Sequence, residues 1–109
     1  MILNFEDMVE TANKEFKGGK LTFYNKVYND GINKVMIGRL EPGASIGLHT
    51  HYNESEMIYI LEGEGTVIYD QDQLPLRPGI CHYCPKGHDH SVINTGEETL
   101  RFFSVIATQ

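Results

Sequence analysis

The fold is decided by two stretches, GASIGLHTHYNESEMIYILEG at residues 43–63 and GICHYCPKGHDHSVIN at residues 79–94. They contain all five histidines, and each has an H-x-H element, at 49–51 and at 88–90. Side chains two residues apart on a β-strand face the same side, so each element can present two imidazoles to one point. Together with the nearby glutamates, they supply the nitrogen and oxygen donors that a metal site needs. The alternative is that these are ordinary surface histidines near turns.

Short runs of alternating residues extend outward from these stretches in both directions. Each run ends at turn residues, such as Asn29-Asp30-Gly31 and Pro85-Lys86-Gly87. About nine such runs at regular spacing favour an all-β sandwich or barrel. No linker interrupts them, so we expect a single domain over residues 1–109. The expected strands are 21–28, 35–40, 46–50, 57–61, 66–69, 74–76, 80–84, 90–93 and 100–107.

The start of the chain has a different pattern, which predicts one helix. Asn4 can cap its beginning and Gly18-Gly19 can end it. We therefore expect a helical segment over residues 1–19 and a β-barrel over residues 20–109. The apolar residues that would share one face of this helix are Phe5, Met8, Val9, Ala12 and Phe16.

Composition excludes some classes of partner. The chain has 109 residues and a net charge of −6, from 15 acidic and 9 basic side chains, whereas a nucleic-acid-binding surface must be basic. No apolar run approaches the roughly 20 residues of a membrane-spanning helix. Residues 1–10 lack the basic start of a secretory signal. We therefore expect a cytoplasmic protein with no nucleic-acid partner and no membrane partner.

Cys81 and Cys84 form a C-x-x-C, which can be a disulfide, half of a zinc site or a redox pair. A redox motif should open a helix, yet Pro85 follows at once. Cysteines three apart on a strand also point to opposite faces, which is poor geometry for a disulfide. We expect two reduced thiols, and their role is left open.

The two stretches resemble the two signature motifs of the cupin superfamily. The first motif, G-x5-H-x-H-x3–4-E-x6-G, is matched by Gly43, His49, His51, Glu56 and Gly63. The second, G-x5-P-x-G-x2-H-x3-N, is matched by Gly79, Pro85, Gly87, His90 and Asn94. All ten positions match in order, and they span about half of the chain.

The resemblance implies a double-stranded β-helix, the jelly-roll barrel of cupins, with one divalent transition metal ion per chain. Its ligands carry over onto His49, His51, Glu56 and His90. The ion would be iron, manganese, nickel, copper, cobalt or zinc, and the resemblance does not select one. Small cupins commonly form homodimers. The N-terminal helix is one candidate interface, although it can equally pack on its own barrel.

Four further residues in or near the two motifs are not expected to bind the metal. His88 falls on a variable position of the second motif and Glu54 falls outside the allowed gap of the first, so neither is expected to bind the metal. His82 shares a strand face with Cys84. It is a candidate substrate contact or acid–base group beside the metal, and the alternative is a packed histidine. Asn94 is expected to hydrogen-bond backbone in a turn.

Strand parity predicts which side chains face the interior of the barrel. Glu56 shares its face with Ile58 and Ile60, whereas Met57, Tyr59 and Leu61 would face the other side. The last strand leaves two choices for the interior, Phe102 with Ser104 or Arg101 with Phe103.

The reaction is not determined by the resemblance, because cupins include dioxygenases, decarboxylases, isomerases and proteins that only bind ligands. We expect a small metal-dependent cupin, an enzyme acting on a small polar metabolite such as a carboxylate, a keto acid or a sugar derivative. The alternative is a metal-bearing small-molecule binding or sensing module without turnover. No catalytic residue is identified beyond the candidate His82.

Overall fold

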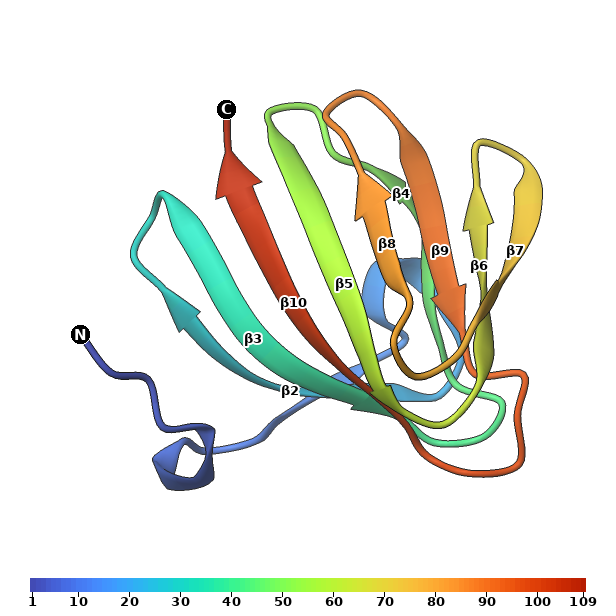
Figure 1. Ribbon diagram of the computed structural model, residues 1–109, viewed down its shortest axis with the longest axis horizontal. Helices are drawn as coiled ribbons and strands as arrows, with labels where there is room; N and C mark the ends of the chain where they lie inside the picture. The colour runs from blue at the N-terminus through green and yellow to red at the C-terminus, as the bar shows by residue number, and fades with distance from the viewer.

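Two antiparallel sheets face each other in the computed structural model, which describes residues 1–109 (Figure 1). The larger sheet, in the order β1-β2-β3-β10-β5-β8, contains β1 (Thr11–Lys14), β2 (Thr22–Asn29), β3 (Asn33–Leu40), β10 (Leu100–Thr108), β5 (Glu54–Glu62) and β8 (Cys81–Cys84). The smaller sheet, in the order β4-β9-β6-β7, contains β4 (Ser45–Thr50), β9 (Asp89–Ile93), β6 (Gly65–Tyr69) and β7 (Asp72–Leu76). This arrangement confirms the predicted all-β jelly roll, and every expected strand is present.

Strand alternation places apolar side chains between the two sheets. In β5, Glu56, Ile58 and Ile60 are buried, whereas Tyr59 and Leu61 on the opposite face are exposed, as the parity of the strand predicts. Of the two choices for β10, Phe102 and Ser104 face inward. The larger sheet therefore contributes mainly apolar side chains to the interior, and Glu56 of β5 and Ser104 of β10 are polar residues that enter it.

The register of the larger sheet aligns its inward-facing residues in rows that cross the strands. One row contains Lys34, Ile106 and Glu56, because Ile106 pairs with both of the others. Another row, six residues further along β3, contains Leu40 and Leu100. These rows define two ends of the interior, which we call the polar end and the apolar end.

Motif residues at the chain's corners have structural roles. The Asn94 side chain donates hydrogen bonds to the carbonyl oxygens of Leu40 and Glu98, both at 2.8 Å, which confirms its predicted contact with backbone. Gly63 has a φ of +81°, and a Cβ at this position would lie 2.3 Å from the carbonyl oxygen of Thr99. Only glycine fits there without moving the backbone.

The N-terminal helix is reduced to a single 3-10 turn, Phe5–Asp7. Asn4 caps this turn, because its side chain accepts a hydrogen bond from the Glu6 N–H. Residues 11–14, which were expected to be helical, instead form β1 and pair with β2 along the edge of the larger sheet. A second 3-10 turn, Phe16–Gly18, leads to β2. Neither turn is long enough or apolar enough to cross a bilayer.

The segment does not form one long helix because its apolar residues pack in two separate places. The Phe5 ring packs against Phe103 on the outer face of the larger sheet, at 6.3 Å between centroids. The Phe16 ring packs against buried Phe23 at 5.4 Å. One straight helix cannot serve both contacts, whereas an edge strand between them also satisfies backbone groups of β2.

Candidate metal centre

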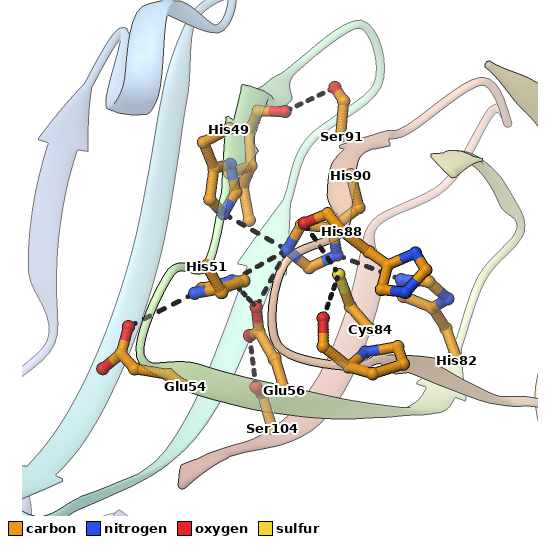
Figure 2. A network of polar contacts seen from close by, with 12 residues as sticks. His49, His51, Glu54, Glu56, His82, Cys84, His88, His90, Ser91 and Ser104 are labelled. Atoms are coloured by element: carbon orange, nitrogen blue, oxygen red, sulfur yellow. Dashed lines mark hydrogen bonds and ion pairs between the residues drawn. The ribbon is translucent and has the colours of Figure 1, made fainter. Parts of the chain in front are cut away.

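Four side chains from three strands and one turn converge at the polar end of the interior (Figure 2). His49 lies on β4 and His90 on the adjacent strand β9, where the two residues are register partners. His51 follows β4, and Glu56 enters from β5 in the facing sheet. One ligand atom from each of the four lies within 4.8 Å of those of the others.

The distances show that one atom of each residue faces a common centre. The Nε2 atom of His90 lies 3.0 Å from Nε2 of His51, 3.2 Å from Nε2 of His49 and 3.1 Å from Oε1 of Glu56. The Nε2 atom of His51 also lies 3.0 Å from Oε1 of Glu56. Three imidazole nitrogens and one carboxylate oxygen form a donor set that suits a divalent transition metal ion.

Hydrogen bonds on the far side of two imidazoles favour the tautomer that a metal ligand needs. Nδ1 of His49 lies 2.7 Å from the carbonyl oxygen of Gly47, which can only accept, so Nδ1 carries the proton and Nε2 keeps its lone pair. Nδ1 of His51 lies 3.3 Å from Oε1 of Glu54. Glu54 therefore contacts the outer nitrogen of His51 and does not face the centre.

Glu56 is held as an anion despite its burial. Burial alone raises the pKa of this carboxyl group, but hydrogen bonds with His51 and His90 outweigh that effect and hold the pKa well below its usual range. The second carboxylate oxygen accepts a hydrogen bond of 2.6 Å from the Ser104 hydroxyl. One negative charge therefore faces three imidazoles, and a divalent cation at the centre would compensate it.

The pKa values of the imidazoles differ with their surroundings. Burial lowers the pKa of His49, which favours the neutral ring. The hydrogen bond with Glu56 raises the pKa of His51 above its usual value. Without a metal, His51 therefore retains a proton beside the Glu56 carboxylate to a higher pH than His49 does.

His82 lies behind His90 and outside the centre (Figure 2). Its Nε2 atom is 3.0 Å from Nδ1 of His90, and burial lowers the pKa of His82 to about 4, so its ring is neutral at pH 7. If Nε2 of His90 binds a metal, Nδ1 of His90 carries the ring proton. Nε2 of His82 then accepts a hydrogen bond from this N–H group. His82 thus contacts a candidate ligand.

The remaining sequence candidates are not among the four converging residues. His88 contacts Asp70 and stacks on the Tyr69 ring at 5.5 Å. The cysteines are both free thiols, with Cys81 exposed and Cys84 buried, and burial raises the pKa of Cys84 to about 12. Cys84 and His82 also form a second group of possible ligand atoms with His90. In that group the thiol is protonated at neutral pH.

A cavity of about 260 Å³ adjoins the four candidate ligands, all of which line it. Its wall includes side chains of β2 and β3 that the sequence analysis did not assign to the site, among them Val27, Lys34 and Met36. The alternation along β2 and β3 indicates which of their residues face inward. It does not indicate that these strands lie across from β4, because this depends on pairings between distant segments.

Solved structures with the same fold include two that exceed 25% sequence identity. One is a predicted oxalate decarboxylase from Thermotoga maritima, with a TM-score of 0.93, 28% identity and full coverage of both chains. The other is a putative sugar phosphate isomerase from Acidithiobacillus ferrooxidans, with a TM-score of 0.73 and 31% identity. That match covers 81% of this chain and 60% of the other.

Two curated relatives are similar to part of the chain. Over 68 residues the chain is 41% identical to the oxalate-binding protein of Thermotoga maritima, covering 62% of this chain and 56% of the relative. It is 34% identical over 59 residues to an uncharacterized protein of Methanocaldococcus jannaschii, covering 54% and 47%. The chain thus matches about half the length of these relatives. Residues 36–106 match the Cupin_2 family, described as a cupin domain. The chain therefore belongs to the cupin family.

Proposed function

We propose that this protein is a metal-dependent cupin whose divalent ion is held by His49, His51, Glu56 and His90, and that it acts as an enzyme on a small carboxylate. The observation that carries the proposal is the convergence of three imidazole nitrogens and one carboxylate oxygen within 4.8 Å. Such an ion supplies Lewis-acid chemistry at a substrate oxygen. Four protein ligands leave one or two positions of a five- or six-coordinate ion for that oxygen.

The choice of a carboxylate is supported by the relatives and by the charges at the cavity. A relative with 41% identity is named an oxalate-binding protein, and a structure with 28% identity is described as a predicted oxalate decarboxylase. Lys17 and Lys34 line the cavity, which favours an anionic ligand. Glu54 and Glu56 line it as well, but a bound divalent ion compensates the negative charge of Glu56.

The second candidate function is a metal-bearing binding module without turnover. It is favoured by the small number of acid–base groups in the cavity, since apart from the proposed ligands only Glu54, Lys17 and Lys34 can exchange a proton there. Incubation of the metal-loaded protein with excess oxalate or pyruvate separates the two functions. Consumption of many equivalents per chain supports an enzyme, and saturable binding without consumption supports the module.

Metal binding is tested by measuring the metal content of protein prepared with defined metals. We expect about one ion per chain, and we expect that His49→Ala and His90→Ala lose most of it, because each removes one of the four donors. His88→Ala is the matched control, since His88 is a neighbouring histidine outside the cluster. Full metal retention in both ligand variants would refute the proposed centre.

We also propose that the protein forms a homodimer through the outer face of β5 and β8. Met57 pairs with Tyr83 there, and Tyr59 and Tyr83 are 44% and 51% exposed. Adjacent exposed aromatic residues of this kind are typical of interaction surfaces. Sedimentation should show a dimer that Tyr83→Lys converts to monomer, with the same substitution at exposed Tyr52 as the control. A monomeric unsubstituted protein would contradict the proposal.

A further inference from the structure

The cavity beside the proposed metal centre is larger and more apolar than oxalate needs. It occupies about 260 Å³, and since a water molecule in the liquid takes about 30 Å³, it has room for roughly nine heavy atoms. Oxalate has six heavy atoms, and four of them are oxygens. A ligand of that composition would leave part of the cavity unfilled and would offer nothing to its apolar wall.

The polar and apolar parts of the cavity lie on different elements. The proposed ligands come from β4, β5, β9 and the turn after β4. The opposite wall includes Val27 of β2 and Met36 of β3, which are register partners. Lys34 lies in the same cross-strand row as Glu56 but two strands away, which is roughly 10 Å at the backbone. The cavity therefore runs from the polar centre along an apolar wall to a cationic rim.

Few hydrogen-bonding groups are available along that wall. The side-chain oxygen of Asn25 already accepts a hydrogen bond from Asn13 at 3.1 Å, and its amide nitrogen faces the sulfur of Met36 at 3.8 Å. The other groups between the centre and the rim are mainly aliphatic and aromatic, including Phe102 and Ile106. Asn29 and Thr50 also line the cavity, but the hydroxyl groups of a sugar would find few partners along the apolar wall, and burying them unpaired is unfavourable.

We infer that the ligand of this cavity is a 2-oxo acid with an aliphatic chain of about four carbons. The inference rests on the proposed function, because the carboxylate and the oxo oxygen require the metal's open positions. The chain lies along Val27 and Met36 and fills the volume that oxalate leaves empty. Lys34 at the rim adds an attraction for the anion that does not depend on chain length.

The inference is tested by calorimetric titration of the metal-loaded protein with a series of 2-oxo acids. The series is pyruvate, 2-oxobutanoate, 2-oxopentanoate and 4-methyl-2-oxopentanoate, with oxalate as the reference. Affinity should rise about fourfold for each added carbon until the cavity is full, as burial of a methylene group predicts. Binding of 4-methylpentanoate, which lacks the oxo group, should be at least about tenfold weaker than that of its 2-oxo counterpart.

A variant of the apolar wall tests where the chain lies. Val27→Asn should weaken binding of 4-methyl-2-oxopentanoate about fivefold and leave oxalate unchanged, because Val27 contacts only the chain. Val27 is 39% exposed, so the variant should fold. Leu48→Asn is the matched control, since Leu48 is exposed on β4 and does not line the cavity. The inference would be overturned if Val27→Asn and Leu48→Asn changed the affinity for 4-methyl-2-oxopentanoate equally.

The outcomes separate the inference from the proposed function. If the protein binds metal and oxalate but affinity stays flat or falls along the series, the inference is wrong and the proposed function stands. If the protein binds no metal, or binds metal but neither oxalate nor any 2-oxo acid, the proposed function is wrong as well. A rise along the series that Val27→Asn reduces, while Leu48→Asn leaves it unchanged, supports both.

Discussion

The same strands build the apolar end and the polar end of the interior, yet the two ends carry opposite chemistry. At the apolar end, Leu40 and Leu100 are fully buried and pair across β3 and β10. At the polar end, β10 and β5 contribute Ser104 and Glu56, which are also buried but hydrogen-bonded to each other. The two ends are about 20 Å apart along β3, from Leu40 to Lys34. The difference indicates that the apolar end stabilises the fold. The polar end instead keeps the buried negative charge of Glu56, which neighbouring side chains compensate.

The first prediction removes packing at the apolar end. Leu40→Ala should lower the free energy of unfolding by about 3 kcal/mol, because it leaves a cavity where the side chain is fully buried. Urea denaturation of the metal-free protein measures this effect. Leu61→Ala, at a half-exposed position on the outer face, should cost less than about 1 kcal/mol. If Leu40→Ala also removed the bound metal from the folded protein, the two ends would be coupled and the comparison would fail.

The second prediction changes the polar end instead. Glu56→Gln should weaken metal binding by at least about a hundredfold, because it replaces an anionic donor with a neutral amide. In a metal titration followed by thermal unfolding, the stabilisation by saturating metal should then fall by about 2.7 kcal/mol.

Glu54→Gln is the matched control for this second prediction. Glu54 contacts only the outer nitrogen of His51, so its effect on metal affinity should be much smaller. Equal losses in the two glutamate variants would show that charge in the region, and not the position of one donor, determines metal affinity.

The third prediction concerns the contact behind His90. His82→Phe keeps a ring of similar size but removes the acceptor for the Nδ1 proton of His90, so metal affinity should fall by about thirtyfold. Competition with a chelator of known affinity measures the change. Tyr83→Phe, on the outer face of the same strand as His82, should leave the metal affinity unaltered. Unchanged affinity in His82→Phe would mean that the packing of His90 alone orients its ring.

Features that depend on local spacing could be predicted from the sequence. The resemblance to the two cupin motifs indicated which four side chains belong together, and the structure brings them within 4.8 Å. The parity of β5 indicated that Glu56 faces the interior with Ile58 and Ile60, which the structure confirms. The second inference needs only the period of a strand, whereas the first needs the whole motif.

Features that depend on pairing between distant segments could not be predicted in the same way. Residues 11–14 have a helical pattern but gain more as an edge strand on β2. The wall formed by Val27 and Met36 becomes part of the site only because β2 and β3 lie opposite β4. The contact between His82 and His90 joins strands of different sheets, and parity alone placed His82 only on the correct face.

The last prediction uses pH to distinguish the metal-free and metal-loaded forms of the polar end. Because Glu56 raises the pKa of His51 above the usual 6.5 in the folded chain, this pair stabilises the metal-free protein fully below pH 6.5. The contribution is lost as the pH rises through the folded pKa. The metal-free protein should therefore lose stability as the pH rises above 6.5.

The metal-loaded protein should change in the opposite direction. A metal ion must displace the proton of His51, so its affinity should fall as the pH decreases, by at most about tenfold per pH unit for one displaced proton. Thermal unfolding with and without metal at pH 6, 7 and 8 measures both trends. At the apolar end no group titrates, so Leu40→Ala should shift both curves downward without changing their slopes. If the two slopes had the same sign, the proton and the metal would not compete for His51, and the proposed ligand set would need to exclude it.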